Sequence, residues 1–97
     1  MATYIVLLRY THQGITNVKQ GPARIDAAKQ AFRAMGAEMK AVYSVMGQYD
    51  AVAITEAPDD ETMTKIALAL GSQGNVRSET LRAFTEDEFR KIVAAIP

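Results

Sequence analysis

Residues 43–56 read YSVMGQYDAVAITE, and their pattern is typical of two strands joined by a short turn. Two runs rich in residues that favour β-strands lie on either side of a short connection, Gly47-Gln48-Tyr49-Asp50. Glycine and aspartate are typical of tight turns, because Gly47 can adopt a positive φ and Asp50 can bond to turn amides. Residues 38–46 and 51–56 are therefore predicted to be two strands of one hairpin.

A strand and a helix are predicted before this hairpin. Residues 3–11 (TYIVLLRYT) form a strand that is largely apolar on both faces, which is typical of a central strand covered on two sides. Residues 12–14 are expected to form a turn, and residues 15–20 an irregular or single-turn segment. The pair Gly21-Pro22 then opens a helix with one apolar stripe, and Gly36 ends it.

A helix, a strand and a last helix are predicted after the hairpin. The second main helix is expected to have Asp59 as its N-cap and to end at Gly71. Residues 75–84 form a strand whose interleaved charges suit the edge of a sheet. Thr85 and Glu88 form a capping box that starts the last helix. The apolar stripe of this helix consists of Phe89, Ile92, Val93 and Ile96.

The predicted order β-α-β-β-α-β, with an added C-terminal helix, is the ferredoxin-like arrangement, and it fills residues 1–97 as one α+β domain with an antiparallel four-stranded sheet. Right-handed crossovers place both main helices on one face of that sheet. The other face then stays uncovered. The third strand is expected to place the small residues Ala51, Ala53 and Thr55 on this face, rather than charged residues. An open apolar face of this size is not tolerated by a monomer, so we expect a homodimer with its two sheets packed face to face.

The composition excludes several classes of protein. Eleven basic residues balance eleven acidic ones, so the basic excess of a nucleic-acid-binding protein is missing. No apolar run reaches the roughly 18 residues that span a bilayer, so no membrane partner is expected. There is no cysteine, and neither a metal motif nor a cofactor motif is present, so no cofactor is predicted. The N-terminus lacks the pattern of a signal peptide, which makes the cytoplasm the expected location.

Tyr49 and Asp50 are the first candidate site residues. A phenol and a carboxylate at a strand junction could bind a polar ligand or move a proton. Turn chemistry also explains them, with Tyr49 packed down and Asp50 bonded to turn amides, and the sequence favours this structural interpretation.

His12 and Arg9 are the other two candidates. His12 is the only histidine, and it follows a central strand at the sheet end where Asp50 is also expected, but a lone histidine beside glycine is more often a loop residue. Arg9 follows an apolar run, where an unpaired charge is costly. It either emerges at the strand end, pairs with a carboxylate such as Glu56, or binds an anionic ligand. Lys19 and Arg24 flank the start of the first helix, where an anion is favoured, although the glycines of a phosphate loop are missing.

The chain resembles the GYD-domain family, which takes its name from the pattern present here as Gly47-Gln48-Tyr49-Asp50. The resemblance covers nearly the whole chain. It includes TYIVLLRYT (3–11), then His12-Gln13-Gly14-Ile15, Asn17, Lys19, Pro22 and Arg24, MGQYDAVAITEAPDDE (46–61), LALGSQGNVRSETLRAFT (68–85) and the acidic start of the last helix.

The resemblance implies a dimeric α/β-barrel fold, in which two ferredoxin-like sheets close on each other. The wider superfamily includes cofactor-free monooxygenases, haem-degrading enzymes, lactone isomerases and members without known chemistry, so the fold alone does not define a function. The sequence favours a homo-oligomeric protein that binds a small molecule or acts as an accessory protein. The alternative is a cofactor-independent oxygenase or isomerase, with a pocket between the helices and the sheet or in the dimer cavity. Ala51 and Ala53 leave room for this pocket, and His12, Tyr49, Asp50 and Arg9 are its candidate polar groups.

Overall fold

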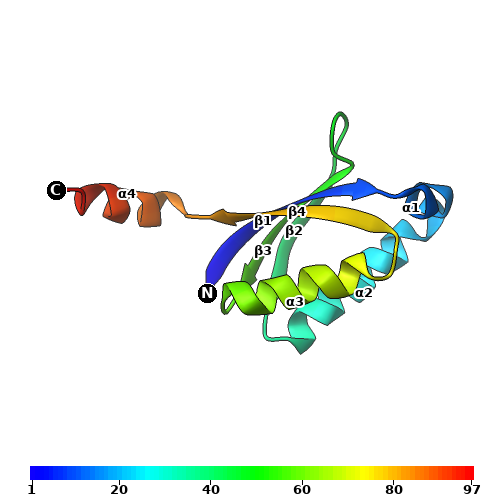
Figure 1. Cartoon of the computed structure of the whole chain (residues 1–97), viewed down its shortest axis with the longest axis horizontal. Coiled ribbons are helices and arrows are strands. Elements are labelled where there is room, and N and C mark those ends of the chain that lie inside the picture. The colour runs from blue at the N-terminus through cyan, green and yellow to red at the C-terminus, as the bar shows by residue number, and fades with distance from the viewer.

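The computed structural model describes all 97 residues as a four-stranded antiparallel sheet with helices on one face (Figure 1). The elements in chain order are β1 (Ala2–Tyr10), α1 (His12–Thr16), the 3₁₀ turn η1 (Val18–Gln20), α2 (Gly21–Ala34), β2 (Glu38–Ser44), β3 (Ala51–Ala57), α3 (Asp60–Gly71), β4 (Val76–Ala83) and α4 (Glu86–Ala94). The strand order is β2-β3-β1-β4, so β1 is central and β4 lies at an edge. The predicted ferredoxin-like arrangement with an added C-terminal helix is confirmed.

The core lies between the sheet and the two helices α2 and α3, which cover the same face (Figure 1). Its buried apolar residues are Tyr4, Val6, Phe32, Ala37, Ala53, Ala57, Met63 and Ile66. The expectation that the small residues of β3 face the open side is wrong, because Ala53 and Thr55 are buried on the helix side. Small side chains on that side leave the space that the large side chains of Phe32 and Ile66 fill.

The opposite face of the sheet carries no helix (Figure 1), and it is apolar in its middle. In the register of the strands, Ile5 lies between Ile54 and Leu81, so one apolar row crosses three strands. Leu7 continues the surface beside Val52, whereas its neighbour on the edge strand β4 is the charged Glu79. Directly opposed residues share a face, so these apolar side chains form one continuous apolar surface, which we call the open face. An uncovered apolar face was expected, and the single chain has one. On β3 it is formed by Val52 and Ile54 rather than by the expected Ala51, Ala53 and Thr55.

One predicted turn differs in the structure. Residues 12–14 were expected to form a turn, yet they begin α1, because the Thr11 hydroxyl caps the helix by accepting a hydrogen bond from the Gly14 N–H at 3.0 Å. The second main helix ends at Gly71 as predicted, and the chain then turns at Gly74, which has a positive φ of 85°.

The β2–β3 connection is longer than predicted. β2 ends at Ser44, so Val45 and Met46 belong to a hairpin loop, which the Val45 N–H closes with a 3.0 Å hydrogen bond to the Asp50 carbonyl. Gly47 has the positive φ expected for it, 108°. The loop rises on the side of the sheet away from α2 and α3 (Figure 1), and we call residues 45–50 the hairpin loop.

The C-terminal helix α4 extends past the end of β4, away from α2 and α3 (Figure 1). The predicted capping box is present, since the Thr85 hydroxyl accepts from the Glu88 N–H and the Glu88 carboxylate accepts from the Thr85 N–H. The apolar stripe of α4 is exposed, with Phe89 59% accessible. The extension gives the chain a radius of gyration of 14.6 Å, against about 12.5 Å for a compact domain of this length.

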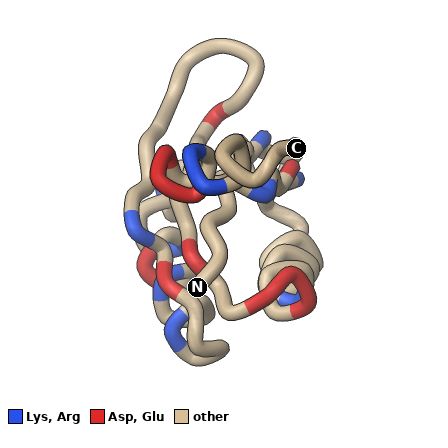
Figure 2. The backbone as a smooth tube through the Cα atoms, turned by 90° about the vertical axis from the view of Figure 1, so that its left-hand side faces the viewer, with Lys and Arg blue, Asp and Glu red and all other residues tan.

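The surface carries charges of both signs. Acidic and basic residues are interspersed along the backbone, and Asp50 is the only charged residue of the hairpin loop (Figure 2). None of the helices combines the length and the apolar character that a membrane span requires.

Candidate functional site

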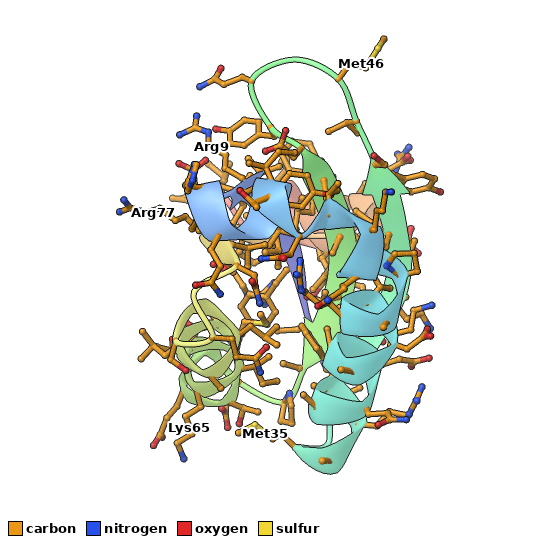
Figure 3. The ribbon with its side chains drawn as sticks, turned by 90° about the vertical axis from the view of Figure 1, so that its right-hand side faces the viewer. Arg9, Met35, Met46, Lys65 and Arg77 are labelled. Carbon is orange, nitrogen blue, oxygen red and sulfur yellow. The ribbon has the colours of Figure 1, made fainter.

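Three of the four predicted site residues meet at the base of the hairpin loop. The Arg9 Nε donates to the Gln48 carbonyl at 3.1 Å, and its guanidinium lies 4.7 Å from the centre of the Tyr49 ring. The Tyr49 hydroxyl donates to the Glu79 carboxylate at 3.1 Å, and this hydrogen bond raises the pKa of Tyr49. Figure 3 shows Arg9 near the loop base and Met46 at its tip, directed away from the sheet.

Asp50 ties the same loop to the central strand. Its carboxylate accepts from the Tyr10 N–H at 2.8 Å, and its own N–H donates to the Leu8 carbonyl at 2.8 Å. The structural interpretation of Asp50 therefore matches its geometry, although the bonds go to β1 rather than to turn amides. Arg9 forms no ion pair with Glu56, because its side chain lies along the hairpin loop instead.

His12 does not join this cluster. It is the exposed first residue of α1, and its backbone carbonyl accepts from the Thr16 hydroxyl at 2.8 Å. No hydrogen bond connects the His12 side chain with Asp50. A site that combines His12 with Asp50 is therefore not formed in this structure.

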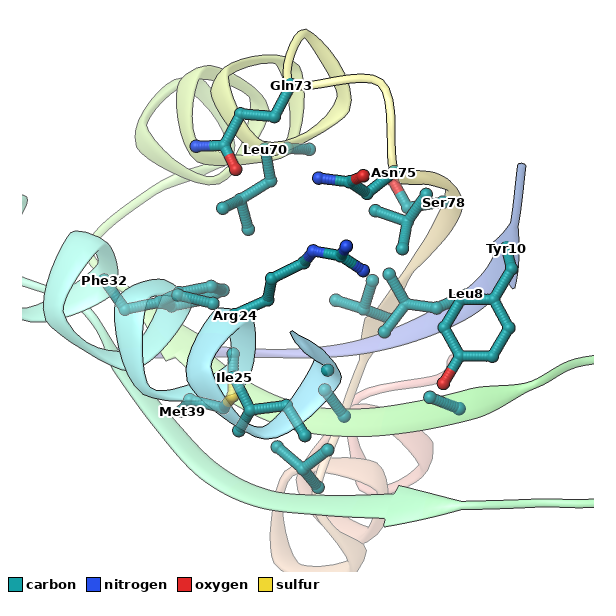
Figure 4. Close-up of a pocket in the computed structure, with 18 of the residues that line it drawn as sticks. Leu8, Tyr10, Arg24, Ile25, Phe32, Met39, Leu70, Gln73, Asn75 and Ser78 are labelled. Atoms are coloured by element: carbon teal, nitrogen blue, oxygen red, sulfur yellow. The ribbon is translucent and has the colours of Figure 1, made fainter. Parts of the chain in front are cut away.

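A cavity of about 150 Å³ lies on the other side of the sheet, between the sheet, α2 and α3 (Figure 4). Fourteen of its 19 lining residues are hydrophobic, which makes it an apolar site with a few polar groups. Ala51 and Ala53 line it, so the room expected above these small residues exists between the helices and the sheet, which is one of the two places expected for it. We call this space the helix-side cavity.

Arg24 is the one charged residue that lines the helix-side cavity. Figure 4 shows its side chain reaching from α2 toward Asn75. Its Nη2 donates to the Asn17 carbonyl at 3.0 Å, and no carboxylate forms an ion pair with it. The sequence indicated Arg24 only as a cation near a helix start. Its spacing of four from Ala28 and of eight from Phe32 was the signal that it shares their inward stripe.

A second depression runs between α3 and the edge strand β4, and we call it the α3–β4 groove. Leu68 lies in it and is 69% exposed. Tyr4 is buried beneath it and donates a hydrogen bond to the Asp60 carboxylate. Burial and this hydrogen bond raise the pKa of Tyr4 to about 12. The sequence did not indicate this groove, because it depends on how far α3 lies from β4.

Comparison with known proteins assigns the family. Residues 4–93 match the model of the GYD domain. The chain belongs to the GYD-domain family. A curated relative from Thermus thermophilus, named glutamine synthetase and cystathionine beta-lyase binding protein, is 38% identical over 84 residues, which are 86% of this GYD-domain chain and 88% of the relative.

Solved structures agree with the fold. The crystal structure of TTHA0845, also from Thermus thermophilus, matches with a TM-score of 0.57 and 31% identity, over 88% of this chain and 95% of that one. A feast or famine regulatory protein from M. tuberculosis, complexed with L-methionine, matches with a TM-score of 0.67. That protein is only 14% identical, and the match covers 88% of this chain and 51% of the regulator, so it supports the ferredoxin-like fold alone.

Proposed function

We propose that this GYD-domain chain is a homodimeric accessory protein that binds partner enzymes. The observation that carries the proposal is a pair of exposed surfaces with apolar side chains on opposite sides of the sheet, the open face and the α3–β4 groove. One surface suits a second copy, and the other suits a different protein. The Thermus relative supports the second part, because its name states that it binds two enzymes.

The open face suits a second copy for reasons of area and chemistry. The chain exposes 6652 Å², about 1,200 Å² more than the roughly 5,500 Å² expected of a monomer of this mass. A stable dimer interface covers about 800 Å² on each partner, so the excess is large enough for one. The apolar row of Ile5, Ile54 and Leu81 can meet its own copy across a two-fold axis without opposing like charges.

The hairpin loop and α4 fit the same arrangement. The loop rises on the side where the second copy packs, and Met46 at its tip is 98% exposed. Arg9, Tyr49 and Asp50 act in this proposal as positioning residues, because their contacts hold the loop in one conformation before the partner arrives. In this arrangement the second copy also buries the exposed apolar stripe of α4.

The α3–β4 groove suits the partner enzyme. It lies on the helix side of the sheet, so a dimer formed through the open face leaves it accessible. Leu68 offers an apolar anchor, and the outer edge of β4 has unpaired backbone groups that an extended segment can bond. Accessory binding also fits the predicted site residues better than catalysis does, since Arg9, Tyr49 and Asp50 are already engaged within the chain.

Binding to purified enzymes tests the proposal. Glutamine synthetase and cystathionine beta-lyase from the organism that carries this chain are titrated with the chain by isothermal calorimetry. We expect at least one of them to bind, and Leu68→Lys to weaken that binding at least about tenfold, because it places a charge at the anchor. Ile15→Lys is the matched control, since Ile15 is an exposed apolar residue of α1 outside the groove. If the titration shows no heat of binding and no complex for either of the two enzymes, the proposal is overturned.

A further inference from the structure

We infer that the helix-side cavity is a binding site for a small apolar carboxylate, with Arg24 as the group that holds its charge. This inference goes beyond enzyme binding. The cavity and the α3–β4 groove share some lining residues, but Arg24 lines only the cavity and Leu68 only the groove, so either proposal can fail while the other stands.

The charge of Arg24 is not neutralised within the chain. Arg24 is partly buried, and none of the 19 residues that line the cavity is acidic. Its guanidinium reaches the solvent, where it forms the exposed hydrogen bond to Asn17, and it has no counter-charge within the cavity. The guanidinium carries five N–H donors, of which one reaches the Asn17 carbonyl, so the remaining donors are free for a ligand. The forked geometry of a guanidinium matches the two oxygens of a carboxylate.

The rest of the cavity determines the body of the ligand. The walls are formed mainly by aliphatic and aromatic side chains, among them Leu8, Phe32 and Leu70 (Figure 4). A volume of about 150 Å³ resembles that of an apolar cavity that accepts a molecule of the size of benzene. A short branched or aromatic group therefore fits, and a nucleotide or a long acyl chain does not.

The polar lining also excludes two related ligands. An α-amino acid would place its ammonium group near the Arg24 guanidinium, and the cavity offers no carboxylate to pair with that ammonium. A phosphate would bring up to two charges to a single cation among apolar walls. Neutral groups such as the Tyr10 hydroxyl and the Ser78 hydroxyl remain for a second polar atom of the ligand, for example a keto or hydroxyl oxygen.

Two matched sets of probes test the inference by calorimetry on the full chain. One set is isovalerate, its amide isovaleramide and its amino derivative valine. The other is phenylacetate, phenylacetamide and phenylglycine. We expect at least one of the two carboxylates to bind, and its amide and its amino derivative to bind at least about tenfold more weakly, because a charge-assisted bond to Arg24 is lost or opposed. Inorganic phosphate is expected not to bind.

Two arginine variants test whether Arg24 is the residue that binds the carboxylate. Arg24→Met keeps an apolar stem of similar length and removes the charge, so it is expected to weaken carboxylate binding at least about tenfold. Arg33→Met is the matched control, since Arg33 lies exposed on the same helix and does not line the cavity. If Arg24→Met does not fold by circular dichroism, Ala28→Leu, which fills the cavity from α2, replaces it and is expected to abolish binding.

Four results would overturn the inference. They are the failure of both carboxylates to bind at tens of millimolar, equal binding of acid and amide, preferred binding of the amino acid or of phosphate, and carboxylate binding that survives both Arg24→Met and Ala28→Leu. Enzyme binding by wild-type protein alongside any of these results would leave the proposed function intact.

Discussion

Tyr4 illustrates how a single buried hydroxyl shapes the response of this chain to pH. It is buried beneath the α3–β4 groove, it donates to the Asp60 carboxylate, and the Arg82 guanidinium lies 5.6 Å from its ring. Burial and the Asp60 hydrogen bond favour the protonated phenol and raise the pKa of Tyr4 from 10.0 to about 12. The folded state therefore holds this proton more tightly than the unfolded state does. The resulting stabilisation is complete below pH 10 and is lost as the pH rises toward 12.

Replacing Tyr4 by phenylalanine is predicted to remove this pH dependence. Below pH 10 the variant is expected to be about 1 kcal/mol less stable, because Asp60 loses its hydrogen bond. Between pH 10 and 12 the difference in unfolding free energy between wild type and Tyr4→Phe should shrink. Urea denaturation below pH 10 and between pH 10 and 12 measures this difference in unfolding free energy. Tyr49→Phe is the control for an exposed tyrosine. A difference that stays constant up to pH 12 would contradict the assignment.

At the scale of elements, the contact of α1 with the loop before β4 depends on Gly14. A Cβ at this position would lie 1.9 Å from the Asn75 carbonyl oxygen, so a side chain must displace the backbone. Gly14→Ala is predicted to destabilise the fold by about 1–3 kcal/mol. Gly21→Ala is the matched control, because Gly21 has helical φ and ψ and open space around its Cβ position.

Thermal unfolding at one protein concentration compares the two alanine variants. Gly14→Ala should melt at a lower temperature than wild type, and Gly21→Ala at the same temperature or slightly higher, since alanine restricts the unfolded chain at a compatible site. Equal melting of Gly14→Ala and wild type would show that α1 does not pack against the Asn75 backbone as described.

The elements themselves were largely predictable from local patterns. Each of these patterns depends on a few neighbouring residues: the alternation of the strands, the apolar stripes of the helices and the Thr85–Glu88 capping box. The structure contains all of them. The short helix α1 was missed because its cap and its tight contact involve Thr11 and the distant Asn75. The hairpin loop was predicted too short, since strand pairing ends at the Ser44–Ala51 pair for reasons that single residues do not reveal.

The candidate site was predictable only in part. The predicted polar groups were Arg9, His12, Tyr49 and Asp50. Three of them lie together and hold the hairpin loop, whereas His12 lies apart from them. The assignment of β3 to its two faces was wrong, because alternation separates the faces without telling which one the helices cover. The helix-side cavity follows from the packing of α2 and α3, so Arg24 could be placed in it only from the structure.

At the scale of the whole molecule, the features left without a partner point to the same assembly. The open face is apolar, the hairpin loop rises beside it, and α4 extends beyond the sheet with an exposed stripe (Figure 1). A nine-residue helix is too short to be stable by itself in water. In the proposed dimer, a second copy would cover these features and turn an extended chain of 14.6 Å radius of gyration into a compact assembly with two α3–β4 grooves.

The molar mass in solution, measured by sedimentation equilibrium, shows whether the chain forms the proposed dimer. One chain has a mass of 10.6 kDa, so we predict a mass of about 21 kDa for wild type at micromolar concentration. Ile5→Lys, which places a charge in the middle of the open face, should sediment as a monomer with retained secondary structure. A wild-type mass of 10.6 kDa at every concentration, or a dimer that Ile5→Lys leaves intact, would contradict the account.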